Sequence, residues 1–199
     1  MEFESRDFRL AEEILLHRPA WAELRGVIAS ITPAEILEAH EAIARRGRSP
    51  AGGQSAINSI FRDRLEPHGW EGEPRLFDDS PDLRRWKMDF LKDRVGVEVS
   101  FNHAEAIPWT FTRLNIAGES TTVREGHRID AGVAMFATER LKKWARMDSA
   151  VGTFSLACAW LEIMKPIMPI PILVLGLDAE GWEATDLFRG TRSYKTSTS

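Results

Sequence analysis

The sequence predicts a single α/β domain, because helical and strand-like periods alternate along the chain. Apolar residues recur at helical spacing through most of the first 69 residues, whereas the stretch 86–101 shows the two-residue period of strands. The stretch 170–178 is a short, β-branched apolar run, typical of a strand covered on both faces. With 199 residues, the chain is long enough for one well-buried core, and it contains neither an internal repeat nor a clear linker.

Four helices are expected before the strands begin. Asp7 can cap the first, and Pro19 can open the second. The third has the clearest start, because Glu35 follows Thr32 at the spacing of a capping box, and Gly47 is expected to end it. After a loop, RSPAGGQS, the fourth helix is expected in QSAINSIFRDRLEPHGW, where apolar residues recur on one side.

An antiparallel hairpin is expected next, formed by WKMDFL and RVGVEVSF with a short turn at Asp93–Arg94. Alternation places Met88 and Phe90 on one face of the first strand and Asp89 on the other. Opposed residues on such a hairpin have numbers with a constant sum, which is odd for a loop of even length. The numbers of Asp89 and Glu98 sum to 187, so an even loop puts both carboxylates on one face, and an odd loop separates them.

Further strands are expected in IDAGVAMFAT and IPILVLGLD, with a helix in TERLKKWARM and a largely buried helix in SAVGTFSLACAWLEIM between them. A membrane span is not expected in this apolar region, because Glu162, Lys165 and three prolines interrupt it. The tail RGTRSYKTSTS, from about Arg189, is expected to be mobile.

Composition and charge narrow the class of protein. The net charge of −4 gives no overall sign of nucleic-acid binding, so such binding would have to depend on local groups. The single cysteine, Cys158, excludes a disulfide framework and fits a reducing compartment. The charged N-terminus MEFESRDFRL lacks the apolar run of a signal peptide, so we expect a cytoplasmic protein without a membrane partner.

Asp89 and Glu98 are the chemically informative pair. Two carboxylates held close together repel each other, and a divalent cation can offset that repulsion. Mg²⁺ binds oxygen ligands and keeps several waters, so both carboxylates and the backbone carbonyl of Val99 are candidate ligands. A water on such an ion is the nucleophile for phosphodiester hydrolysis. The alternative is that both carboxylates lie on an exposed strand face, paired with Lys87 and Arg94.

The run from Met88 to Glu98 resembles the core of the PD-(D/E)xK nucleases, in which an acidic residue precedes an acid-x-lysine element on a strand hairpin. It is more similar to the BglII-type restriction endonucleases, which lack the lysine and have the spacing D-x8-E-x-(Q or E), against D-x8-E-x-S here. The flanking segments GGQSAINSIFRDRL, GVAMFAT and PILVLGLD agree, so the resemblance spans roughly residues 50 to 180. By position, it makes Asp89 and Glu98 metal ligands.

This resemblance implies a restriction-endonuclease-like core, with a central mixed sheet flanked by helices. It implies a type II restriction enzyme that depends on Mg²⁺, with Mn²⁺ able to substitute, and that cuts a short palindrome in double-stranded DNA. Such enzymes act as homodimers, since a twofold site matches a twofold protein.

Ser100 is the main departure and the third candidate catalytic residue, because it stands where the family has glutamine or glutamate. Serine is uncharged and has a shorter reach, so at most it positions a water or ligates weakly. His103 and Glu105, just past the strand, are candidates to replace that function. Two alternatives therefore stay open: a DNA-binding or assembly protein that kept the fold and lost turnover, and a scaffold in which the carboxylates only stabilise the hairpin.

Candidate DNA contacts rest on weaker signals. Arginine, lysine and backbone N–H groups bind phosphates, so the basic end of the third helix and the N-terminus of the fourth, near Ser55, are candidates. The alternative for the arginines is that they complement the dipole at the C-terminus of the third helix. The alternative for Asn58 and His103 is that they are exposed polar residues without a role. The candidates are Arg45, Arg46, Arg48, Asn58 and His103, with a second basic cluster at Arg189, Arg192 and Lys195.

Overall fold

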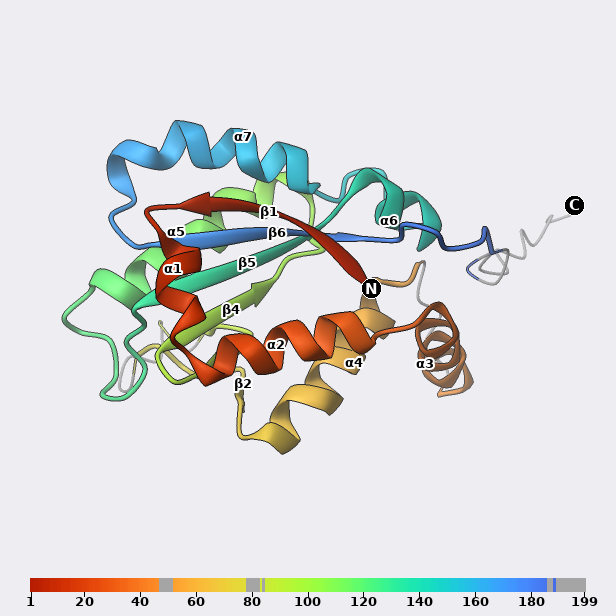
Figure 1. Cartoon of the computed structure of the whole chain (residues 1–199), viewed down its shortest axis with the longest axis horizontal. Helices are drawn as coiled ribbons and strands as arrows, with labels where there is room; N and C mark the ends of the chain where they lie inside the picture. Colours follow the sequence, from red (N-terminus) through yellow and green to blue (C-terminus); the bar gives the residue numbers. More distant parts are fainter. Residues whose placement is uncertain (47–51, 78–82, 84, 186–187, 189–199) are drawn as a thin grey trace, which may run out of the picture.

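A mixed sheet of six strands lies between two layers of helices (Figure 1). The structure is a computed structural model that describes residues 1–46, 52–77, 83, 85–185 and 188. The strand order is β1-β6-β5-β4-β3-β2, in which β4, β5 and β6 are parallel and the outer pairings are antiparallel. The strands are β1 (Glu2–Phe8), β2 (Glu71–Gly72), β3 (Phe90–Lys92), β4 (Val95–Val99), β5 (Ala131–Ala137) and β6 (Ile172–Asp178). The predicted central mixed sheet is confirmed.

The helices divide between the two faces of the sheet, and each layer encloses its own apolar core. The first core joins the sheet to α1 (Ala11–Leu16), α2 (Pro19–Ser30), α3 (Pro33–Arg45), α4 (Gln54–Leu65) and α6 (Glu139–Trp144). The second core joins the opposite face to α5 (Ile107–Glu119) and α7 (Phe154–Met164). Short 3-10 turns are η1 (Glu66–His68), η3 (Ala104–Ala106) and η4 (Lys165–Ile167). Among the residues that the structure describes, no helix combines the length and apolar character needed to cross a membrane.

Two of the predicted helix starts are confirmed, at Pro19 for α2 and after Thr32 for α3. Thr32 accepts the Glu35 N–H at 3.4 Å and the Glu35 carboxylate accepts the Thr32 N–H at 2.9 Å, which confirms the capping box. The prediction that Asp7 caps the first helix is wrong, because Asp7 lies in β1 and the N-cap of α1 is Leu10. The Asp7 carboxylate still accepts the N–H of Glu12 at 2.9 Å. The expected helix end at Gly47 and the expected mobile tail from Arg189 lie outside the described residues.

Three elements, β1, β2 and α5, are not expected from the sequence, and the burial of α7 is misjudged. The side chains of β1 are mostly exposed, so no apolar alternation marks this edge strand, which is held by backbone pairing with β6. The helix α5 does carry a signal, because Phe111 and Leu114 recur at helical spacing and are fully buried. The expectation that α7 is largely buried is wrong, since its outer side chain Ile163 is 68% exposed.

The hairpin of β3 and β4 has the expected register. Phe90 pairs with Val97, so paired numbers sum to 187, and the loop is the even-length Asp93–Arg94. Both loop residues have positive φ, 49° and 62°, as a two-residue type I′ turn requires. The pairing stops at Phe90, because the chain bends at Asp89. This bend overturns the predicted alternation: Met88 packs in the core beside α5, and Phe90 packs in the opposite core.

Candidate active site

A cavity of about 740 Å³ opens at the carboxyl end of β4, between α4 of one layer and α5 of the other. In open α/β sheets, the carboxyl ends of the strands are where ligands commonly bind. The first turn of α4, the bend before β3, the segment after β4, α5 and the loop after α6 all contribute to its wall. Its polar lining residues are Gln54, Ser55, Asn58, Asp89, Asn102, His103, Arg113 and Asp148.

The divergence of β3 from β4 creates this opening. Ser100 donates its N–H to the Met135 carbonyl of β5 at 2.8 Å, so the preceding Val99 faces the other way, where β3 has bent aside. The Asp89 carboxylate lies there instead of a strand and accepts the Val99 N–H at 2.6 Å. Because the N–H and C=O of a strand residue point to the same side, the Val99 carbonyl also faces Asp89.

Glu98 is the most deeply buried charged group of the site, with 1% of its surface exposed. Arg113 donates to both of its carboxylate oxygens, at 2.9 and 2.6 Å, in a bidentate pair. Burial raises the pKa of Glu98 to about 8, against the lowering effect of Arg113 and with a further rise from the Asp89 charge. Burial also raises the pKa of Asp89, which the Val99 N–H and Arg113 oppose. The two carboxylates are therefore electrostatically coupled.

These contacts overturn the interpretation of the carboxylates as an exposed surface pair. Lys87 pairs with Glu73 at 2.9 Å, and Arg94 pairs with Asp130 at 2.6 Å. Glu98 instead relies on Arg113, a residue of α5 that the sequence pattern did not single out. A buried carboxylate needs such a partner, because an uncompensated charge in the interior is costly.

Ser100 is buried under α5, with 3% of its surface exposed. Its hydroxyl oxygen accepts a hydrogen bond from Thr110 at 3.1 Å, and Ser100 is not among the residues that line the cavity. It is therefore placed to support the packing of β4 against α5. Glu105, a candidate to replace it, is exposed and does not line the cavity either, whereas His103 does.

The donor set fits a hard divalent cation. Asp89, Glu98 and the Val99 carbonyl offer oxygen ligands, and Mg²⁺ is commonly held by one or two carboxylates with the remaining positions filled by waters or phosphate oxygens. No group of three or more histidine, cysteine, aspartate or glutamate side chains suited to a metal occurs within the described ranges. Arg113 would have to share Glu98 with the ion or release it.

The candidate DNA contacts divide into two groups. Asn58 and His103 line the cavity, and α4 begins there at Gln54. No side chain among the described residues caps this helix start, where N–H groups favour an anion. Arg45, by contrast, is exposed on α3 and forms a 3.7 Å ion pair with Glu41. Arg46 is also exposed and does not line the cavity. Arg48, Arg189, Arg192 and Lys195 lie outside the described residues.

The pairing of two loops completes the outer wall of the cavity. His103 forms an isolated bridge with Val151, and Gly152 donates its N–H to the Asn102 carbonyl at 2.9 Å. The loop after α6, which includes Asp148, is thereby held beside the segment that follows β4. Sequence reasoning could not place Asp148 here, because the contact joins segments that are distant in the chain.

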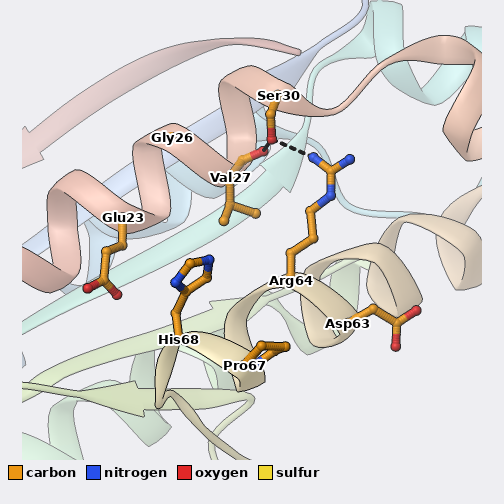
Figure 2. Close-up of a pocket in the computed structure, with 8 residues that line it drawn as sticks. All are labelled: Glu23, Gly26, Val27, Ser30, Asp63, Arg64, Pro67 and His68. Atoms are coloured by element: carbon orange, nitrogen blue, oxygen red, sulfur yellow. Dashed lines mark hydrogen bonds between the residues drawn. The ribbon is translucent and has the colours of Figure 1, made fainter.

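A second cavity, of about 600 Å³, lies between α2 and the α4–η1 segment (Figure 2). Its charged groups already have partners within the protein. Arg64 donates to Ser30 and pairs with Glu35, while Glu23 accepts two hydrogen bonds from Lys92. It contains none of the residues expected to act in catalysis, so the candidate site is the cavity at Asp89.

Comparison with known proteins agrees with the fold. A family model described as restriction endonuclease BglII/BglIII matches residues 3–177. A crystal structure of restriction endonuclease BglII complexed with a DNA 16-mer is similar to the chain with a TM-score of 0.67 and 15% identity, covering 90% of this chain and 78% of that one. A crystal structure of free BglII gives a TM-score of 0.57 and 15% identity, with 90% and 81% covered. No match was found among curated proteins.

Proposed function

The chain belongs to the restriction endonuclease BglII/BglIII family, and from this premise we propose that it is a divalent-metal-dependent type II endonuclease that hydrolyses phosphodiester bonds in double-stranded DNA. One observation carries the proposal. The Asp89 carboxylate accepts the N–H of Val99, the residue next to Glu98, so both acidic residues of the pattern lie at the carboxyl end of β4, and Asp89 lines a cavity that the first turn of α4 also lines.

Asp89, Glu98 and the Val99 carbonyl would hold the cation, with Mg²⁺ as the physiological ion and Mn²⁺ as a substitute. When bound, such an ion supplies a water of lowered pKa and positive charge beside the phosphate. The N–H groups at the start of α4 bind a phosphate of the substrate strand, since a helix N-terminus attracts anions. Asn58, one turn further along α4, orients that phosphate by hydrogen bonding.

The two paired loops supply the remaining polar groups. Asn102, His103 and Asp148 line the cavity and offer both hydrogen-bond donors and acceptors. Donors and acceptors of this kind meet the base edges exposed in a DNA groove or the phosphates beside it. Their placement beside the carboxylates lets one bound duplex contact both sets of groups.

The direct test is incubation with DNA of mixed sequence in Mg²⁺ or Mn²⁺, followed by mapping of the ends. The wild type is expected to produce ends at one short sequence, and Asp89→Asn is expected to abolish cleavage because it removes a charged ligand from a site with few. Asp63→Asn is the matched control, since Asp63 is exposed on α4 and does not line the catalytic cavity. Full activity in Asp89→Asn would exclude the metal mechanism.

A second candidate is a DNA-binding or assembly protein that retains the nuclease fold without turnover. The burial of Ser100 beneath α5 and the bidentate Arg113–Glu98 pair favour it, because neither arrangement is directly poised for hydrolysis. Sequence-selective DNA binding by the wild type, with no cleavage in either metal, would support this candidate over the enzyme.

A further inference from the structure

A small pocket adjoins the candidate active site on the outer side of α5. It has a volume of about 190 Å³ and is lined by Arg85, Trp86, Trp109 and Arg113. Arg113 lines this pocket and also the cavity that contains Asp89. The pocket and the candidate active site therefore share Arg113 as a wall residue.

Two tryptophans form one wall of this pocket. Trp109 lies on α5 one turn before Arg113 and has 58% of its surface exposed. Its ring meets Trp86 edge to face at 6.3 Å, and Trp86 in turn meets Phe77 at 6.3 Å. Trp86 is thus held between two aromatic rings, and much of the Trp109 ring stays open to solvent. An exposed ring of this size offers a flat apolar face on which a ligand can stack.

The two arginines give the pocket positive charge. Within the described residues, the Arg85 side chain has neither a hydrogen bond nor an ion pair, and it is exposed. Arg113 is held by Glu98 at 2.6 Å. The pocket thus combines an open aromatic ring with at least one uncommitted guanidinium, which matches a ligand that carries both a flat ring and an anion.

We propose that this pocket binds one unpaired nucleotide of the DNA substrate, with the base stacked on Trp109 and a phosphate beside Arg85. The base must be unpaired, because bases within a duplex present only their edges in the grooves. The proposal rests on the proposed function in that the nucleotide belongs to the strand bound at Asp89. It adds a site for a frayed, overhanging or extruded nucleotide next to the point of cleavage.

The test measures binding without cleavage, in EDTA, with fluorescently labelled DNA. The probes are a blunt duplex, the same duplex with a short single-stranded tail, and the tail strand alone. The wild type is expected to bind the tailed duplex roughly fivefold to a hundredfold more tightly than the blunt one, the range of one base–aromatic stack. Trp109→Ala is expected to remove this preference and to leave the affinity for blunt duplex unchanged, whereas Trp109→Phe retains part of it.

Matched controls separate stacking from general losses. Trp160→Ala removes a partly exposed tryptophan from α7, and Arg25→Ala removes an exposed arginine from α2 on the opposite layer, so both are expected to keep the preference. Arg85→Ala is expected to reduce it. Thermal unfolding and blunt-duplex affinity report whether the variants are folded. An equal preference in Trp109→Ala, or no preference in the wild type, overturns the proposal.

The experiments test the nucleotide pocket and the nuclease activity separately. Cleavage in Mg²⁺ or Mn²⁺ without any preference for a tail would reject the nucleotide pocket and leave the nuclease intact. A preference that depends on Trp109 in a protein that cuts no DNA would reject the nuclease and retain the pocket. A wild type that binds none of the three probes would reject the pocket.

Discussion

Among single residues, the buried pair of Glu98 and Arg113 dominates the electrostatics of the site. Arg113 donates to both oxygens of Glu98 and lowers the pKa of both Glu98 and Asp89, against the effect of burial. Removing one partner of a buried pair leaves an uncompensated charge, which typically costs about 3–5 kcal/mol. We infer that Arg113 stabilises the site before an ion binds, so the sequence motif alone does not account for the stability of these acids.

The stability of the metal-free protein is expected to fall with rising pH because of Glu98. Its folded pKa is about 8, above the ordinary value of 4.5, so the folded state holds a proton that the unfolded state releases. The associated stability is complete below the unfolded pKa and is lost as the pH rises through the folded pKa, from about pH 5 to pH 8. Urea unfolding in EDTA over this range measures the effect.

Glu98→Gln is the matched variant for this pH dependence, because it keeps the size of the side chain and cannot ionise. It is expected to flatten the change in urea midpoint between these pH values. An unchanged slope in Glu98→Gln would assign the pH dependence to other groups.

Ser100 is expected to matter more for packing than its position in the motif suggests. Ser100→Ala loses the hydrogen bond from Thr110, so a destabilisation of about 1 kcal/mol is expected. Ser100→Gln restores the family residue but places a larger side chain in a buried position, at a cost of about 1–3 kcal/mol. Urea unfolding and cleavage rates check both variants. A glutamine variant that is stable and more active than the wild type would contradict this prediction.

Among the elements, α4 depends on close packing against α6 for its position in the cavity wall. The N–H of Gly53 donates to the Ala145 carbonyl at 2.7 Å. A side chain at Gly52 would meet the backbone oxygens of Arg146 and Ala145 at 2.5 and 2.9 Å. Backbone atoms cannot move aside as a side chain can, so this glycine permits the contact that sets the start of α4.

Gly52→Ala is expected to destabilise the protein by about 1–3 kcal/mol and to weaken DNA binding, because the start of α4 must move. Gly26→Ala is the matched control on α2, where an added Cβ meets nothing within 4 Å. There the same substitution is expected to stabilise by about 0.5–1 kcal/mol, since alanine favours the helix interior. Urea unfolding and DNA affinity measure both, and a neutral Gly52→Ala would contradict the close-packing argument.

For the whole molecule, we predict a homodimer on DNA, because a twofold protein matches a palindromic site. Light scattering is expected to give twice the 22.5 kDa chain mass, with two chains per duplex that carries the cleavage site. A non-cleavable condition, EDTA or Ca²⁺, keeps the complex intact during the measurement. A monomer both free and with DNA would count against palindromic cleavage and would favour a protein that binds one half-site.

The sequence alone predicts those elements that are specified by residues only a few positions apart. The capping box at Thr32, the two-residue turn at Asp93–Arg94 and the buried strand β6 all follow from spacing and side-chain type. The register sum of 187 follows from the length of that turn. These features depend on hydrogen bonds and burial between near neighbours, which a single sequence contains directly.

Contacts between distant segments determined the rest of the site. The bend at Asp89, the approach of Arg113 to Glu98 and the burial of Ser100 under Thr110 all depend on how α5 and β3 pack against β4. The exposed edge strand β1 likewise depends on backbone bonds to β6, which carry no side-chain signature. Spacing along the chain could bring the two acids to one hairpin. Arg113, which pairs with Glu98, and the cavity beside Asp89 are in place only when the helices pack on both faces of the sheet. The reason is that Arg113 lies on α5 and the cavity is lined by both α4 and α5.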